Sequence, residues 1–111
     1  MVKILNRKDI ILVPFPFSDL SNSKTRPALV LSKNKFNKNS EDIIVCAITS
    51  NLDTNNSVFI EKKDWQNGNY SESVIKYSNL ITLDKKLVIK QIGILSDEKF
   101  EEVLIKIKEV I

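Results

Sequence analysis

Arg26 is the residue in this sequence whose chemistry is most specialised. The chain contains 17 lysines and arginines, yet only Arg7 and Arg26 are arginines. Arg26 opens a short apolar run and follows a polar segment, Ser18–Thr25. A guanidinium is always charged and presents parallel donors that match two oxygens of a phosphate. The sequence around Arg26 therefore predicts an anion site, with phosphate as a fitting ligand.

The composition excludes several kinds of active site. The chain has no histidine and a single cysteine, Cys46. Imidazole bases, Ser-His-Asp triads and histidine metal sites are thereby removed, and a structural zinc site is not expected. One cysteine cannot form an internal disulfide, which fits a reducing cytosol, and its apolar neighbours predict an inert buried thiol. Any catalysis must rest on Arg, Lys, Thr, Ser, Tyr or carboxylate groups.

Length and charge predict one cytoplasmic domain. The 111 residues are enough for a single apolar core, so the domain is expected to span residues 1–111. The net charge of +3 permits an anionic partner without requiring one. No apolar run approaches the roughly 18 residues that span a bilayer, and the first residues do not resemble a secretory signal. We therefore expect no membrane association.

Two apolar runs position Arg26. Ile10–Phe17 begins as a buried strand, but Pro14 and Pro16 each remove a backbone donor. This part of the strand should therefore lie at a sheet edge or leave the sheet. Pro27–Leu31 reads as the second strand, so Arg26 is expected at a strand entrance.

The middle of the chain predicts several short strands. Asp42–Ile48 is the most clearly buried of them, and it ends in the small polar residues Thr49, Ser50 and Asn51. The segment Ser32–Glu41 is expected to be a turn. The other expected elements are Val58–Ile60, a loop or short helical turn over Lys62–Tyr70, and strands over Ser73–Lys76, Ile81–Leu83 and Leu87–Ile89.

The C-terminal segment changes to a helical period. Ser96 is a good N-cap, and the acidic residues Asp97 and Glu98 occupy the first turn, where they complement the helix dipole. Apolar residues then recur at helical spacing, at Phe100, Val103, Leu104, Ile107, Val110 and Ile111. Many short strands followed by one amphipathic helix predict a mainly β fold, a small antiparallel barrel with helical decoration.

Several motifs together resemble the PemK/MazF toxin family. They are Lys8–Ile11 with Val13–Phe17, Asp19-Leu20, Lys24–Ser32, Ala47–Ser50, Lys63–Trp65 with Gly68, Leu80–Asp84 and Ile92–Ser96. The resemblance implies an SH3-like barrel of the CcdB/PemK type. It also implies a homodimeric, sequence-selective endoribonuclease toxin of a type II toxin–antitoxin system, without metal or cofactor, inhibited by a cognate antitoxin.

The resemblance also implies site residues and a reaction. The catalytic arginine and threonine of the family fall on Arg26 and Thr49. The RNA-binding positions fall on Phe17, Ser18, Asp19, Lys24, Ser50, Asn51 and Asn79. Members cut single-stranded RNA through its own 2′-hydroxyl, leaving a 2′,3′-cyclic phosphate and a 5′-hydroxyl. A guanidinium and a hydroxyl donor suit the charge that develops on phosphorus, whereas arginine is a poor proton acceptor and Asp19 is a weak candidate for that role.

Other interpretations of the same residues stay open. An arginine before a strand is usually a surface ion-pair partner, and a threonine at a strand end is usually a turn residue. Phe15, Phe17 and Trp65 could stack on bases or pack in a core. Lys33, Lys35 and Lys38 could follow phosphates or belong to a solvated turn.

The sequence also departs from the family pattern at four positions. Lys8 replaces a frequent glycine, Ser78-Asn79 replaces a frequent Asp-Gln pair, and Ile81 replaces a frequent arginine. Two alternative functions follow: a non-enzymatic CcdB-like toxin acting on DNA gyrase, or a member that binds RNA without cutting it.

Overall fold

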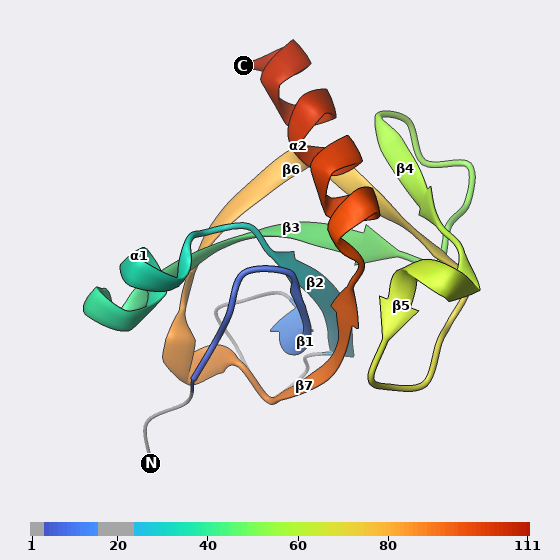
Figure 1. Ribbon diagram of the computed structural model, residues 1–111. Coiled ribbons are helices and arrows are strands. Elements are labelled where there is room, and N and C mark those ends of the chain that lie inside the picture. The colour runs from blue at the N-terminus through green and yellow to red at the C-terminus, as the bar shows by residue number, and fades with distance from the viewer. Residues whose placement is uncertain (1–3, 16–23) are drawn as a thin grey trace.

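The computed structural model describes residues 4–15 and 24–111, and these form a curled antiparallel sheet crossed by a helix (Figure 1). The seven described strands run in the order β4-β6-β3-β2-β1-β7-β5. The strands are β1 (Asp9–Phe15), β2 (Lys24–Val30), β3 (Asp42–Thr49), β4 (Ser57–Ile60), β5 (Trp65–Gln66), β6 (Ser73–Asp84) and β7 (Lys90–Leu95). The helices are α1 (Asn34–Asn39) and α2 (Asp97–Val110), with 3-10 turns η1 (Lys62–Asp64) and η2 (Lys85–Leu87). The predicted mainly β barrel with a C-terminal helix is confirmed.

Pro14, the described proline of the first apolar run, lies at a place in the sheet that tolerates proline, as predicted. β1 pairs with β2 along most of its length, including Pro14 opposite Thr25. Its pairing with β7 on the other side reaches only from Asp9 to Leu12. Pro14 therefore occupies a stretch of β1 that needs no backbone donor toward β7. Pro16 lies outside the described residues.

The boundaries of three predicted strands are wrong in the same way, because each depended on long-range pairing. The segments Ser73–Lys76 and Ile81–Leu83 are strand, as expected, but they belong to one strand, β6, which pairs with β3 through Val74–Lys76 and Leu80–Asp84. The expected strand Leu87–Ile89 is the end of η2 and a connection, and β7 begins at Lys90. Local composition does not reveal these boundaries, since the partner strand decides them.

The expected turn over Ser32–Glu41 is also wrong, because it contains the helix α1. The helix has no side-chain N-cap and no acidic residue in its first turn, so the sequence carries no start signal. The helix is instead stabilised by contacts of the buried residue Asn37. Its side-chain amide donates to the carbonyl oxygens of Leu5 and Ser32, at 3.2 and 3.0 Å.

The two faces of the sheet bury two separate apolar clusters. One lies under α2 and includes Leu29, Ile48, Ile75, Phe100 and Val103. The other lies on the opposite side of β1, β2 and β3. It is formed by Leu5, Ile11, Val13, Ala28, Val30, Ile43, Val45, Leu83 and Val88. The alternation of neighbouring residues such as Leu29 and Val30 between the two clusters is the period of a β-strand.

Helix α2 forms as predicted, from its N-cap onward. The Ser96 hydroxyl accepts from the Lys99 amide at 3.3 Å. Of the predicted apolar stripe, Phe100 and Val103 are buried and Leu104 and Ile107 are half-buried. The last two members, Val110 and Ile111, are exposed, because the helix runs past the edge of the cluster that it covers.

Lys8 adopts the left-handed backbone conformation that glycine favours, with φ of 80°. The turn therefore keeps a glycine-like shape although the residue is lysine. The next residue, Asp9, is buried and accepts from the Asn6 amide at 2.9 Å and from Gln91 at 2.8 Å. Burial raises the pKa of the Asp9 carboxyl, and these two hydrogen bonds act against that rise.

Candidate active site

Strand pairing brings Arg26 and Thr49 to one end of the sheet. Arg26 lies opposite Val13 of β1. On its other side β2 pairs with β3, and the recorded pairing ends at Ala28 opposite Ala47. Arg26 and Thr49 each lie two residues beyond this last pair, so both stand at the same end of the β2–β3 ladder. Both side chains project on the same face as Val13 and Ala28, because residues two apart in a strand share a face.

A cleft of about 230 Å³ joins these residues. The described residues that line it are Val13, Arg26, Pro27, Ala28, Ala47, Ile48, Thr49, Thr54, Lys76, Asn79 and Ile81. Apolar side chains of the second cluster form part of its floor, and polar groups from β2, β3 and β6 form its walls. The cleft, called the Arg26 cleft below, therefore combines an apolar base with convergent polar groups, as small-molecule and substrate sites do.

The charge of the Arg26 cleft is positive. Its described lining contains two cationic side chains, Arg26 and Lys76, and no carboxylate. Neither cation forms an ion pair with any residue in the described part of the chain. Two like charges facing one hollow raise the local potential and favour an anionic ligand.

Lys76 is the cleft residue that sequence reasoning missed. Cys46 of β3 pairs with Leu80 of β6, but the next residue, Ala47, pairs with Lys76. The three residues between Lys76 and Leu80 thus form a bulge in β6, which bends the strand. The bulge lets Lys76, Asn79 and Ile81 line one cleft although their spacing fits no simple alternation. No local sequence signal marks such a shift, since the register against β3 creates it.

Thr49 is held by the loop that follows it. Its hydroxyl oxygen accepts from the Asn51 amide at 3.1 Å, and the Asn51 side chain accepts from the Asp53 amide at 3.2 Å. The Thr54 hydroxyl donates to the Asn51 carbonyl at 2.7 Å. Accepting a hydrogen bond does not use the hydroxyl hydrogen of Thr49, so that hydrogen can still be donated to an oxygen in the cleft.

The structure brings together only some of the residues predicted for the site. Arg26, Thr49 and Asn79 line the cleft, whereas Lys24, Ser50 and Asn51 are exposed and lie outside its lining. Phe17, Ser18 and Asp19 lie outside the described residues. Within that description, no group of three His, Cys, Asp or Glu side chains is placed to hold a metal ion.

Two further sequence hypotheses are decided by burial. Trp65 is buried and donates through Nε1 to the Ile92 carbonyl at 3.3 Å, so it belongs to the core and is not a base-stacking surface. A Cβ at Gly93 would meet Trp65 Nε1 at 2.3 Å, which explains why glycine is required there. Cys46 is fully buried, and burial raises the pKa of its thiol to about 12, as expected for an inert cysteine.

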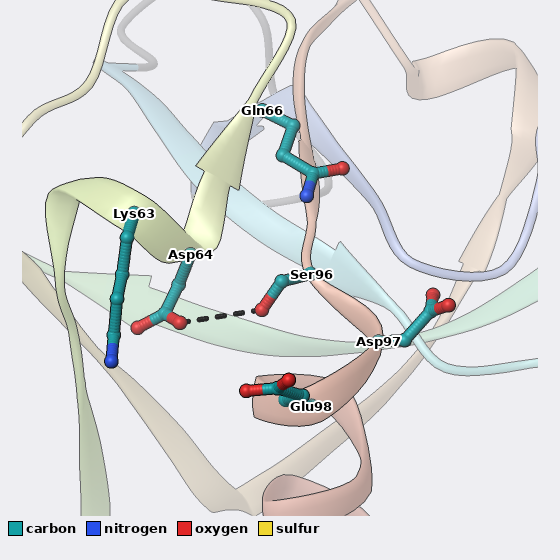
Figure 2. Close-up of a pocket in the computed structure, with 6 residues that line it drawn as sticks. All are labelled: Lys63, Asp64, Gln66, Ser96, Asp97 and Glu98. Carbon is teal, nitrogen blue, oxygen red and sulfur yellow. Dashed lines mark hydrogen bonds between the residues drawn. The ribbon is translucent and has the colours of Figure 1, made fainter.

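A second hollow lies where η1 meets the start of α2 (Figure 2). It has a volume of about 330 Å³ and is lined by Lys63, Asp64, Gln66, Ser96, Asp97 and Glu98. The buried Asp64 carboxylate accepts from the Glu61 amide at 3.0 Å and from the Ser96 hydroxyl at 3.3 Å. The Ser96 amide donates to the Asp64 carbonyl at 2.7 Å. This hollow, called the Asp64 hollow below, is thus a hydrogen-bonded joint between η1 and α2.

The fold and the site together define a small barrel, a curled seven-stranded sheet with a cationic cleft at one end of its central strands. The model of the PemK-like, MazF-like toxins of type II toxin–antitoxin systems matches residues 6–111. The chain belongs to this family.

Solved structures of low sequence identity share the fold. MazF from Deinococcus radiodurans is 19% identical, with a TM-score of 0.79 over 98% of this chain and 97% of that one. MazE-MazF from the same organism is 18% identical, with a TM-score of 0.78 and coverage of 98% and 96%. An endoribonuclease in complex with its cognate antitoxin, from a mycobacterial species, is 16% identical, with a TM-score of 0.77 and coverage of 97% and 93%.

Membrane insertion through a helix finds no support in the described residues. Neither α1 nor α2 is both long and apolar enough to cross a bilayer.

Proposed function

We propose that this protein is a metal-independent endoribonuclease toxin that cuts single-stranded RNA in the Arg26 cleft. The observation that carries the proposal is the meeting of Arg26, Lys76 and the Thr49 hydroxyl around one hollow whose described lining has no carboxylate. Family membership supports the same reaction class, since relatives with this fold are named as endoribonucleases. RNA is a polyanion that supplies its own nucleophile, so the cleft has to bind the chain, stabilise the charge that develops on phosphorus and allow two proton transfers.

The proposed step is an internal displacement at phosphorus. The 2′-oxygen forms a bond to phosphorus, its proton leaves to a base, the bond to the 5′-oxygen breaks, and that oxygen receives a proton. The products are a 2′,3′-cyclic phosphate and a 5′-hydroxyl. The Arg26 guanidinium binds two non-bridging oxygens as their charge grows, and Thr49 donates to one further oxygen. The described lining of the cleft offers no carboxylate for the proton that leaves.

Binding of the flanking RNA falls to the remaining cleft residues. Lys76 adds a second positive charge for a neighbouring phosphate, and the Asn79 amide offers both a donor and an acceptor to a base edge. Ile81 makes the adjoining surface apolar, which suits the face of a base.

Two partners belong to the same proposal. A cognate antitoxin would block the cleft, and the support is that relatives of this fold were crystallised with antitoxins. A homodimer would complete the RNA groove, and the exposed apolar residues Ile105 and Val110 of α2, with Ile111 directly after it, offer surface for such an assembly. Sedimentation velocity of the purified chain would measure its oligomeric state directly.

The decisive test is cleavage of a short single-stranded RNA by purified protein in excess EDTA. We expect cleavage by the wild-type protein and a loss of roughly 10²–10³ in rate for Arg26→Ala, about 3–4 kcal/mol of transition-state stabilisation. Because Arg26 is exposed, the variant should unfold at the wild-type temperature. Arg26→Lys is the matched control, since it keeps the charge and loses the planar pair of donors.

Other outcomes of that test would support the alternatives. Intact RNA at high protein concentration would contradict the proposal. RNA that is bound but not cut would identify a binding protein without nuclease activity. Toxicity in cells that survives Arg26→Ala, without RNA cleavage, would favour a toxin that acts through protein contacts, such as contacts to DNA gyrase.

A further inference from the structure

Helix α1 presents an exposed aromatic ring among lysines. Lys33, Lys35, Phe36 and Lys38, called the α1 patch below, are all exposed, and Phe36 is 42% accessible to solvent. A shallow depression of about 460 Å³ is lined by Lys33, Lys35, Phe36, Asn39 and Ser40. A single exposed apolar side chain is common, and Phe59 is exposed to the same extent. The feature that distinguishes Phe36 is its place among three exposed lysines.

The lysines of the patch are not used in the fold. Among the described residues, the ion pairs of lysine involve Lys8, Lys63, Lys99 and Lys106, and none involves the patch. Lys33 and Lys35 also stand at the N-terminal end of α1, where a positive charge opposes the helix dipole. The acidic residues nearest in sequence, Glu41 and Asp42, follow the helix and lead into β3.

The patch is nevertheless held rigidly in place. Asn37, on the inner side of α1, is buried and donates to the Leu5 and Ser32 carbonyl oxygens. Lys85 donates to the Asn37 carbonyl at 2.7 Å, and the Asn34 side chain accepts from the Arg7 amide at 2.7 Å. A partner of the outer side would therefore meet a surface that is already ordered, which lowers the entropic cost of binding.

We propose that the α1 patch is a second contact for single-stranded RNA, bound by a part of the substrate that lies outside the Arg26 cleft. The inference rests on the proposed nuclease function. A single-stranded polynucleotide fits both the aromatic ring and the lysines of the patch. Its bases can stack on the ring, and every nucleotide carries a phosphate that can pair with a lysine. An acidic peptide would use the lysines but would leave the aromatic face without a planar partner.

The position of α1 sets the length of RNA required. α1 precedes β3 at Asp42, whereas Thr49 ends β3 at the cleft. The eight residues of β3 span about 23 Å at roughly 3.3 Å per residue. In Figure 1 the helix lies on the side of the barrel away from β4 and β5. An RNA that fills only the cleft would therefore not reach the patch, whereas one longer by several nucleotides would.

The test compares a short RNA with a longer one, both carrying 2′-O-methyl groups so that neither can be cut. The first variant carries Lys33→Gln, Lys35→Gln and Lys38→Gln. For the long RNA, the plot of log affinity against log salt should become less steep by about 2, because each lost phosphate contact removes about 0.7 from the magnitude of the slope. Phe36→Ala should weaken binding of the long RNA roughly tenfold through lost stacking. Binding of the short RNA should not change in either variant.

The matched control removes the same number of charges elsewhere, through Lys62→Gln, Lys90→Gln and Lys108→Gln. These side chains are exposed as the patch lysines are, so both triple variants should fold, which thermal unfolding verifies. The control should leave the salt slope for the long RNA unchanged. An equal fall of the slope in both triple variants would overturn the proposal, because net charge alone would then explain it.

Two further outcomes separate the inference from the proposed function. Loss of binding to a polyglutamate peptide in the patch variant, with unchanged binding of long RNA, would overturn the inference and identify an acidic protein partner. Cleavage of an unmodified short RNA by the wild-type protein tests the nuclease independently, and the patch variant should cut that RNA at the wild-type rate. Patch-dependent binding of long RNA without any cleavage would support the contact and reject the nuclease.

Discussion

The two hollows of this barrel use polar residues in opposite ways. In the Asp64 hollow the central carboxylate is surrounded by donors, from Glu61, Ser96 and, at 3.7 Å, the ammonium group of Lys99. In the Arg26 cleft two cations face the same space, and within the described residues neither has an ionic partner. The first arrangement satisfies its own groups, and the second needs an anion from outside.

The contrast shows why volume alone does not identify a site. The Asp64 hollow is the larger of the two, at about 330 Å³ against about 230 Å³. Its acidic residues serve the start of α2, where Asp97 and Glu98 complement the helix dipole. We therefore expect substitutions in the Asp64 hollow to change stability, and substitutions in the Arg26 cleft to change activity.

Asp64→Ala should produce the largest effect on folding. It leaves the Glu61 amide and the Ser96 hydroxyl without their acceptor, and it leaves the largely buried Lys99 with Glu102 as its remaining ionic partner. We expect a cost of about 3 kcal/mol in the free energy of unfolding. Urea denaturation would measure this loss. RNA cleavage per folded molecule should stay at the wild-type level, and a selective loss of cleavage would place Asp64 in the active site after all.

Thr49→Val should produce the next largest effect, mainly on activity, because the hydrogen bond that it removes from the Asn51 amide is exposed to solvent. Valine keeps the shape of threonine and removes the hydroxyl donor, so we expect a fall of roughly 10–100-fold in the cleavage rate. Thr49→Ser, which keeps the hydroxyl, is the matched control. Equal rates for the two variants would show that Thr49 acts only in the turn that contains the Asn51 amide.

Lys76→Met should change RNA binding more than the chemical step. Methionine keeps most of the aliphatic length and removes the charge, so KM for short RNA should rise about tenfold while kcat changes little. Steady-state kinetics at two salt concentrations would check this, because the difference from wild type should shrink at high salt. A fall in kcat with constant KM would assign Lys76 to the reacting phosphate.

Substitutions at Lys8 should produce the smallest effect, at the edge of the Asp64 hollow. Lys8 pairs with Asp97 at 2.7 Å and has a φ of 80°. Lys8→Gly and Lys8→Ala both remove the ion pair, but only glycine accepts this backbone conformation without strain. The glycine variant should be the more stable by about 1 kcal/mol in thermal unfolding. Equal stabilities would mean that the turn relaxes when lysine is replaced.

The sequence predicted those parts of the fold and site that depend on neighbouring residues. The Ser96 cap and the apolar spacing around Phe100 are local signals, and they predicted α2 from its first residue. The apolar run of β3 likewise predicted a buried strand, and the proline in β1 predicted a position that needs no backbone donor. Arg26 and Thr49 were found because each belongs to a recognisable motif, and the structure places both on one cleft. The predicted strand entrance at Arg26 was wrong by two residues, since β2 begins at Lys24 through its pairing with Phe15.

The rest could not be predicted, because contacts between distant segments decide it. α1 carries no cap signal, and the buried hydrogen bonds of Asn37 to Leu5 and Ser32 hold it. β6 looks like two strands until β3 pairs with both halves. Trp65 has the composition of a stacking surface, and only its packing against Gly93 shows that it belongs to the core.

The sequence by itself determined the kind of chemistry available to this protein. Without histidine and with one buried cysteine, the chain has an arginine, lysines and hydroxyl groups with which to bind a phosphate. Only the tertiary structure decided which of these groups meet. The bulge between Lys76 and Leu80 brings Lys76 into the Arg26 cleft. The bulge results from the pairing register of β6 with β3, and this register depends on the sequences of both strands together.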